Sequence, residues 1–145
     1  MLPFFETGGK FMDCIFCKII NGSIPCYKIY EDDKILAILD ISQASKGHTL
    51  VIPKKHFDNS LECDDDILMH LYKIANQLAK KLVKKLDAKG MNILTNINEV
   101  AGQSVKHFHI HLLPRYNDED GVNINFIDSK PSWDELEKLC DYINK

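Results

Sequence analysis

The chain of 145 residues has no apolar stretch near the roughly 18 residues that a membrane-spanning helix requires. Its N-terminus also lacks the basic segment followed by an apolar core that marks a secretory signal peptide. We therefore expect a cytoplasmic protein that does not associate with a membrane.

An excess of positive charge is missing too, because 18 Lys and Arg residues face 21 Asp and Glu residues, for a net charge of −3. Proteins that bind nucleic acids or anionic membranes usually carry a basic surface, so neither partner is expected. A small anionic ligand remains compatible with this balance, since one local site can be positive on an acidic protein. Hydrophobic residues make up 45% and charged residues 27% of the chain, which is typical of one soluble globular domain.

The five cysteines are odd in number, and in the cytosol they are expected to be reduced. Cys14 and Cys17 form a Cys-x-x-Cys pair, which indicates metal binding or redox chemistry. A redox pair prefers the start of a helix that follows a strand, and no strand is predicted before Cys14. A closed zinc site needs two further ligands. The nearby candidates are His48, His56, His70 and a run of histidines near the end of the chain.

That run places three of the six histidines at alternate positions within residues 106–113. Alternation with a period of two is typical of a strand, whose successive side chains point to opposite faces. His107, His109 and His111 therefore share one face, and the apolar residues among them can anchor the other face in a core. Such a row can bind a metal ion, attack phosphorus or transfer protons. Solvated histidines on a half-exposed strand are the plainest alternative.

Hydrophobic spacing predicts an α+β domain with a mainly antiparallel sheet, one long helix and short N- and C-terminal helices. The helices are expected at residues 14–20, 64–86 and 134–143, and the strands at 27–31, 35–39, 48–52, 92–96 and 106–113. Residues 1–10 are interpreted as a flexible leader. One domain follows over residues 11–145, with a variable tail from about residue 117.

Together these motifs resemble the histidine triad (HIT) family of nucleotide hydrolases and transferases. The family pattern stands here as His107-Phe-His109-Ile-His111-Leu-Leu113. The flanking segments that also match are Gly102-Gln-Ser-Val, Pro114-Arg115, Gly47-His-Thr-Leu-Val-Ile-Pro53, Asp40-Ile-Ser-Gln43 and Cys14-Ile-Phe-Cys-Lys-Ile-Ile20. The resemblance spans residues 14–116, with the motifs in family order, and implies the HIT-like fold.

The resemblance implies a hydrolase for a purine nucleoside monophosphate or its conjugates. His109 would attack the α-phosphorus, and water would then hydrolyse the nucleotidyl-histidine. His111 would bond to the phosphate and the leaving group, with His48 as a supporting histidine. The substrate-binding residues would be Gln103 and Ser104 at phosphate oxygens, Asn96 at the phosphate and ribose, Asp40 at the ribose hydroxyls, and Ile15, Phe16, Ile19 and Ile41 around the base.

Zinc-containing members of the family use a Cys-x-x-Cys pair, a histidine after the Ile-Pro-Lys strand and the first histidine of the triad. The corresponding residues here are Cys14, Cys17, His56 and His107. A closed site with four protein ligands is structural, so the resemblance removes His107 from the catalytic set. The family also implies a homodimer in which the long helix and a sheet edge pair across a two-fold axis.

The favoured activity is that of an adenosine 5′-monophosphoramidase, which cleaves AMP from an amine. The phosphate-facing set contains no lysine cluster, and this suits one phosphate better than a chain of several. Three alternatives stay open: a dinucleoside polyphosphate hydrolase, a metallohydrolase in which the histidine run binds a catalytic metal, and a non-catalytic nucleotide-binding protein.

Overall fold

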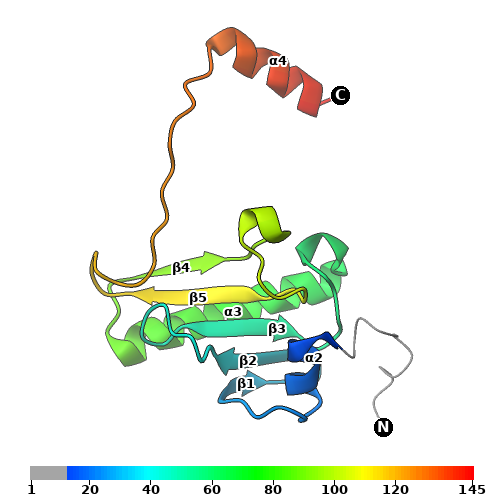
Figure 1. The fold of residues 1–145 in the computed structure, drawn as a ribbon, viewed down its shortest axis with the longest axis vertical. Coiled ribbons are helices and arrows are strands. Elements are labelled where there is room, and N and C mark those ends of the chain that lie inside the picture. Colours follow the sequence, from blue (N-terminus) through cyan, green and yellow to red (C-terminus); the bar gives the residue numbers. More distant parts are fainter. Residues whose placement is uncertain (1–12) are drawn as a thin grey trace.

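The computed structural model describes residues 13–145, so the leader expected at residues 1–10 lies outside the described part. Five antiparallel strands form one sheet in the order β1-β2-β3-β5-β4, shown in Figure 1. The elements are α2 (Ile15–Ile20), β1 (Lys28–Glu31), β2 (Ile35–Leu39), β3 (Thr49–Pro53), the 3-10 turn η2 (Ser60–Glu62), α3 (Asp65–Leu86), β4 (Gly90–Leu94), the 3-10 turn η3 (Glu99–Ala101), β5 (Ile110–Arg115) and α4 (Trp133–Ile143). The α+β prediction with one long helix is confirmed.

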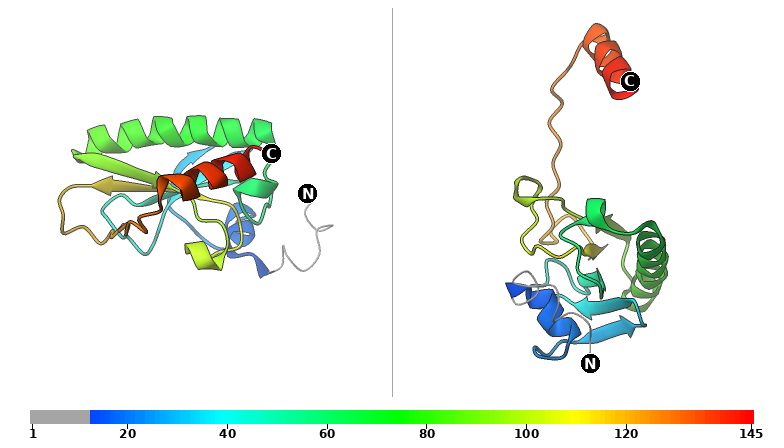
Figure 2. Two further views of the ribbon diagram at one scale, coloured as in Figure 1. Left: turned by 90° about the horizontal axis from the view of Figure 1, so that it is seen from above. Right: turned by 90° about the vertical axis from the view of Figure 1, so that its right-hand side faces the viewer.

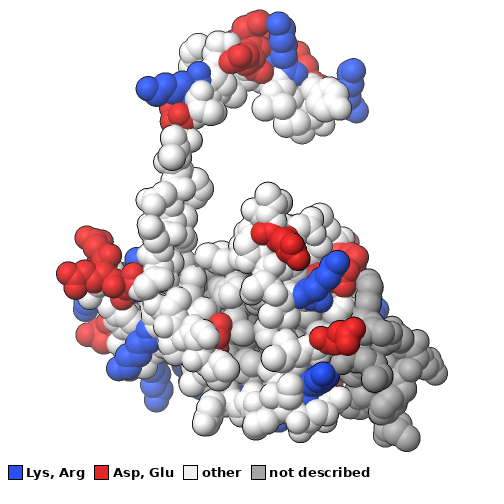
Figure 3. Space-filling model, viewed as in Figure 1, with Lys and Arg blue, Asp and Glu red and all other residues white. Residues whose placement is uncertain are grey.

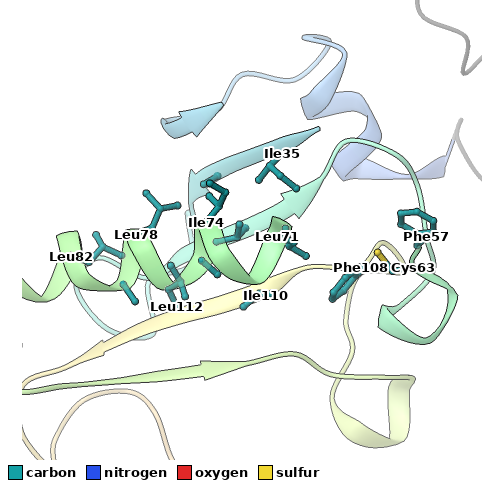
Figure 4. Close-up of a cluster of buried hydrophobic side chains, with 14 residues drawn as sticks. Ile35, Phe57, Cys63, Leu71, Ile74, Leu78, Leu82, Phe108, Ile110 and Leu112 are labelled. Atoms are coloured by element: carbon teal, nitrogen blue, oxygen red, sulfur yellow. The ribbon is translucent and has the colours of Figure 1, made fainter. Parts of the chain in front are cut away.

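The two faces of the sheet are covered by different helices, as the alternation of side chains requires. On β2, Ile35 and Ala37 pack in one apolar cluster with the buried stripe of α3, while Leu36 and Ile38 pack in a second cluster with Phe16 of α2. Figure 2 shows α3 lying along the sheet, and Figure 4 shows its leucines and isoleucines turned toward the strands. The sheet therefore separates a purely apolar layer under α3 from the layer that holds α2.

The histidine run enters the sheet later than predicted. Strand β5 begins at Ile110, whereas the alternation predicted a strand over residues 106–113. Backbone groups of the preceding residues bond outside the sheet: the N–H of Phe108 donates to the carbonyl of Phe57 at 2.7 Å, and the carbonyl of His109 accepts the Thr95 hydroxyl at 2.7 Å. The alternation itself holds, because Phe108 packs in the α3 cluster.

Residues 123–145 form a C-terminal arm that stands off the sheet (Figures 1 and 2). An irregular segment leads to α4, whose N-terminus is closed by a capping box between Ser132 and Glu135. Every residue of α4 is exposed, including the large apolar side chains of Trp133 and Ile143. The predicted helix over residues 134–143 is thus present, but in the single chain it adds nothing to the core.

Charged side chains on the face seen in Figure 3 mix both signs, and Lys and Arg do not gather into one basic patch there. Among residues 13–145, no helix is both long and apolar enough to cross a membrane.

Candidate active site and metal centre

The three predicted catalytic histidines, His48, His109 and His111, lie together where β3 and β5 pair. On β5, His111 pairs in register with Leu50 of the neighbouring strand β3. His48 comes directly before β3, two residues before Leu50, so the rings of His48 and His111 meet diagonally. The Nε2 atom of His48 lies 2.9 Å from Nδ1 of His111, and the ring centroids of His109 and His111 are 4.8 Å apart. The fold thus brings residues from two distant motifs into one site.

The hydrogen bonds of His109 determine which of its nitrogens is free to react. Its Nδ1 atom lies 2.6 Å from the carbonyl oxygen of His107, and a carbonyl can only accept, so Nδ1 carries the proton and Nε2 a lone pair. The ring is buried against the edge of Phe16, with 4.9 Å between the centroids. Burial lowers the pKa of His109 below its ordinary value. The residue is therefore a neutral imidazole with an available nucleophilic nitrogen.

The same reasoning fixes the protons of the other two rings. The backbone N–H of Ala44 donates to Nδ1 of His48 at 3.2 Å, so the proton of neutral His48 sits on Nε2 and is donated to Nδ1 of His111. His111 then keeps its proton on Nε2. Burial, together with neighbouring His109 and His48, lowers the pKa of His111 to about 4, and burial also lowers the pKa of His48. At neutral pH His111 is an uncharged hydrogen-bond donor beside His109.

The four predicted metal ligands form a second, separate cluster. Cys14, Cys17, His56 and His107 each offer one ligand atom, and these atoms all lie within 4.8 Å of one another. Sγ of Cys14 lies 3.2 Å from Nδ1 of His107, and Sγ of Cys17 lies 3.4 Å from Nδ1 of His56. Helix α2 begins between the two cysteines, with the N–H of Cys17 donating to Sγ of Cys14, so the turn itself aims both sulfurs at the histidines.

The outer partners of the two histidines fit a metal site. Nε2–H of His107 donates to the carbonyl of Pro53 at 2.9 Å, and Nε2–H of His56 donates to the carboxylate of Asp58 at 3.0 Å. Both rings therefore present the lone pair of Nδ1 to the sulfurs, as metal-bound histidines do. Two thiolates and two imidazoles are a donor set that zinc prefers in closed tetrahedral sites.

The two thiols of the cluster are electrostatically unequal. A hydrogen bond from the Cys17 thiol holds the pKa of Cys14 far below the usual thiol range against the opposing effect of burial. The bond to Cys14, with burial, raises the pKa of Cys17. One thiolate in this buried cluster therefore forms readily, and a cation would compensate the charge of the second.

The predicted substrate-binding residues differ in their exposure and in their contacts. Asp40 lies at the end of β2, with a carboxylate oxygen 3.6 Å from Nε2 of His48. The amide of Asn96 donates to the carbonyl of Gly102, and Ser104 is exposed at the edge of a hollow of about 310 Å³ that also reaches the metal cluster. The base-facing set is divided: Phe16 is buried, Ile19 is half-buried, and Ile15 and Ile41 are exposed.

Gln103 is placed differently from the other predicted phosphate-facing residues. Its side chain is buried, and both polar atoms of its amide bond to backbone groups of the protein. Sequence reasoning missed two further contributors, the Asp58 carboxylate behind His56 and the backbone N–H of Ala44 behind His48. Asp58 follows His56 by two residues and could have been considered on spacing alone, whereas a backbone donor leaves no trace in residue type.

Comparison with known sequences agrees with this geometry. The profile of the HIT domain matches residues 21–118. The chain is 49% identical over 109 residues to Protein hit of Bacillus subtilis, covering 75% of each protein. It is 38% identical over 133 residues to adenosine 5′-monophosphoramidase hnt1 of Schizosaccharomyces pombe, covering 92% of this chain and 97% of that one.

Solved structures agree as well. A crystal structure of a HIT family protein from Bacillus anthracis matches with a TM-score of 0.86 at 41% identity, over 91% of this chain and 95% of that one. A Zn-bound histidine triad family protein from Mycobacterium smegmatis matches with a TM-score of 0.73 at 32% identity, over 92% and 97%. Sequence, fold and the arrangement of its histidines place the chain in the HIT domain family, as a nucleotide hydrolase.

Proposed function

We propose that the protein cleaves AMP from phosphoramidates through a covalent intermediate on His109. The observation that carries this proposal is the bond from Nδ1–H of His109 to the His107 carbonyl, because it leaves Nε2 unprotonated beside the donor His111. The name of the fission-yeast relative, an adenosine 5′-monophosphoramidase, supports the same substrate class.

In the proposed reaction, the lone pair on Nε2 of His109 forms a bond to the α-phosphorus, and the phosphorus–nitrogen bond to the amine breaks with its electron pair going to nitrogen. Nε2–H of His111 transfers its proton to that nitrogen, which leaves as a neutral amine. The positive charge that develops on His109 is stabilised by the His107 carbonyl. Water then attacks the same phosphorus and returns a proton to Nε2 of His111, which releases AMP and restores neutral His109 and His111.

We propose that Asn96 and Ser104 contact the phosphate, that Asp40 accepts the ribose hydroxyls, and that the base lies against the apolar residues of α2 and the end of β2. The exposed position of Ser104 and the place of Asp40 at the strand end support these roles. A direct phosphate contact by the Gln103 side chain would require some of its bonds to the backbone to break.

A comparison of substrates tests the proposed activity. We expect kcat/KM for an AMP–amine conjugate to exceed that for diadenosine triphosphate, because a polyphosphate leaving group needs more neutralisation than the site offers. Arg115, the last residue of β5, bonds to Asp120 at 3.1 Å and to Asn92 at 2.8 Å. A preference of about tenfold for the polyphosphate, equal to ~1.4 kcal/mol in transition-state binding, would reverse the assignment.

The pH dependence of the reaction follows from the lowered pKa of His109. An ordinary histidine is half protonated at 6.5, but burial favours the neutral form of His109, so its nucleophilic form persists below that pH. We expect the acid limb of the kcat/KM profile to have its midpoint below 6.5. The profile should be measured between pH 4 and 8, roughly the span over which histidines titrate in proteins. A midpoint at or above 6.5 would show that the neutral nucleophile is not favoured.

The metallohydrolase alternative has one observation in its favour, since ligand atoms of Asp40, His48 and His111 also lie within 4.8 Å of one another. The hydrogen bond from the Ala44 N–H to Nδ1 of His48 argues against a metal there. When Nε2 of His48 is protonated, Nδ1 holds the only lone pair of the ring, and Ala44 already occupies it. Metal ligation through Nε2 would require that contact to be lost. The covalent mechanism needs no such change.

We further propose that Cys14, Cys17, His56 and His107 hold one structural zinc ion. A bound zinc would tie the start of α2 to residues 53–58 and to the segment before β5, without taking part in the chemistry. The matched lone pairs of the two histidines and the zinc-bound mycobacterial neighbour support this assignment. Ligation needs reduced thiols, in keeping with a cytoplasmic location.

We propose that two copies of the protein pair through α3 and the edge of β4. Within residues 13–145, strand β4 has a sheet neighbour on one side only, and an unpaired edge is a template for another strand. Exposed apolar side chains on these two elements support pairing through the same surface: Met69 and Tyr72 on α3 and Ile93 on β4. Sedimentation analysis is expected to give twice the chain mass of 16.6 kDa, and a single-chain mass would contradict the pairing.

A further inference from the structure

A short series of contacts leads from the metal centre to the loop that carries Ser104. His56 donates its Nε2–H to the Asp58 carboxylate at 3.0 Å, and the backbone carbonyl of the same Asp58 accepts a bond of 2.6 Å from the Gln103 amide. Asp58 and Gln103 are buried, where an unpaired polar partner costs more than at the surface. The positions of His56 and Gln103 therefore both depend on Asp58.

The Gln103 amide in turn determines the shape of the loop. Its Oε1 atom accepts the N–H of Asn98 at 2.8 Å, and its Nε2 atom donates to the carbonyl of Val105 at 3.0 Å as well as to Asp58. Since Val105 directly follows Ser104, the amide closes a tight turn with Ser104 at its tip. Ser104 stays exposed to a ligand, while the amide that holds it does not.

The loop also contains a strained residue that depends on this amide. Asn98 has φ 70° and ψ 161°, a region that only glycine enters freely and that persists only where the surroundings enforce it. Gln103 supplies two of the enforcing bonds, through Oε1 to the N–H of Asn98 and through its own backbone N–H to the Asn98 carbonyl. If Gln103 shifts, Asn98 can relax and carry the loop with it.

We propose that Gln103 is a positioning residue that couples metal binding at His56 to nucleotide phosphate binding at Ser104, and that it is not itself a phosphate ligand. This inference rests on the proposed function, because it needs both a metal and a nucleotide. A bound metal fixes His56, Asp58 then holds the Gln103 amide, and the turn keeps Ser104 in place. Coupling between two ligands is reciprocal. The nucleotide must therefore raise the affinity for the metal by the same factor as the metal raises the affinity for the nucleotide.

The first experiment measures the AMP dissociation constant by calorimetry in zinc-loaded and zinc-stripped protein. We expect stripping to weaken AMP binding by roughly tenfold in the unaltered chain, within the range of about 5–150-fold that is typical of coupled sites. In Gln103→Met, which keeps the length of the side chain but none of its hydrogen bonds, we expect the two constants to agree within about twofold.

Gln43→Met is the matched control. The Gln43 amide also bonds three backbone groups, at Asp40, Gly47 and His48, but none of its hydrogen bonds reaches residues 56–58. This variant is expected to keep the full ratio between zinc-loaded and zinc-stripped AMP affinity, whatever its own affinity is. Loss of the ratio in both variants would mean that any loosened loop abolishes the coupling, which would contradict a specific role for Gln103.

A second measurement avoids zinc-stripped protein altogether. Release of zinc to a coloured chelator is followed with and without saturating AMP, and AMP is expected to slow it in the unaltered chain and in Gln43→Met but not in Gln103→Met. If zinc and AMP both bind but neither affects the other, the proposed coupling is wrong and the proposed function stands. If the protein binds only one of the two, the proposed function is wrong, and the coupling with it.

Discussion

Replacement of His109 by alanine is expected to reduce kcat by at least about 10⁴-fold, because loss of a nucleophile removes the covalent route entirely. The hydrogen bond from Nδ1–H of His109 to the His107 carbonyl leaves Nε2 of His109 unprotonated, and His109 lies next to the hydrogen-bond donor His111. Steady-state turnover of an AMP–amine conjugate measures the loss. Mass spectrometry of the quenched reaction should show the nucleotidyl adduct in the unaltered protein and not in the variant.

His70→Ala is a suitable control for that experiment. His70 lies outside the site and pairs with Asp32 at 2.7 Å, so its replacement should leave kcat near the unaltered value. His109→Ala should still bind AMP within a few-fold, because Ser104, Asn96 and Asp40 remain. If His109→Ala kept more than a tenth of kcat, another group would have to be the nucleophile.

Protein purified without added metal is expected to contain one zinc ion per chain, and its removal is expected to destabilise the fold strongly. A ligand present at about 1,000 times its dissociation constant stabilises the native state by ~4 kcal/mol, and a closed zinc site binds at least that well. This corresponds to a fall in unfolding temperature of roughly 8–16 °C for a chain of this size. Elemental analysis and scanning calorimetry with and without chelator measure the two effects.

Cys17→Ser should reproduce the loss of zinc and of thermal stability. Cys140→Ser should not, since Cys140 is an exposed cysteine on α4, far from the cluster in sequence. Zinc should also be released as pH falls, because cysteine and histidine bind it only in their deprotonated forms. Full thermal stability of metal-free protein would argue against a structural site, and zinc bound instead by His109 and His111 would reassign it.

Local patterns predicted what depends on local geometry. The alternation of the histidine run placed His107 and His109 on one face, and both rings do lie against Phe16 while Phe108 points into the α3 cluster. The strand pairing of β5 does not extend back to residue 106, because the backbone groups of Phe108 and His109 bond to Phe57 and Thr95 rather than to a neighbouring strand. A pattern of side chains does not reveal which backbone groups will be neighbours.

Partners that are distant in the sequence were beyond such patterns. The Gln103 amide meets Asp58 across 45 positions, and a sequence that shows a glutamine next to a serine suggests only a phosphate contact. The proton positions of His48 and His111 likewise follow from one backbone N–H, at Ala44. Both kinds of information appear only when the fold is known, although the residue types at the site could be predicted from the sequence.

The cluster of Cys14, Cys17, His56 and His107 also has a consequence for biosynthesis. Cys14 and His107 are separated by 93 positions. His107 lies shortly before β5, which begins at Ile110 and inserts between β3 and β4 after both have been made. At about 5–20 residues per second of synthesis, the cysteine pair leaves the ribosome roughly 5–20 s before its partner histidine. Until then the nascent chain exposes two open thiols and two unpaired strands. Insertion of the proposed zinc ion would therefore wait for the same late step as completion of the sheet, and oxidation of the thiols before that step would prevent it.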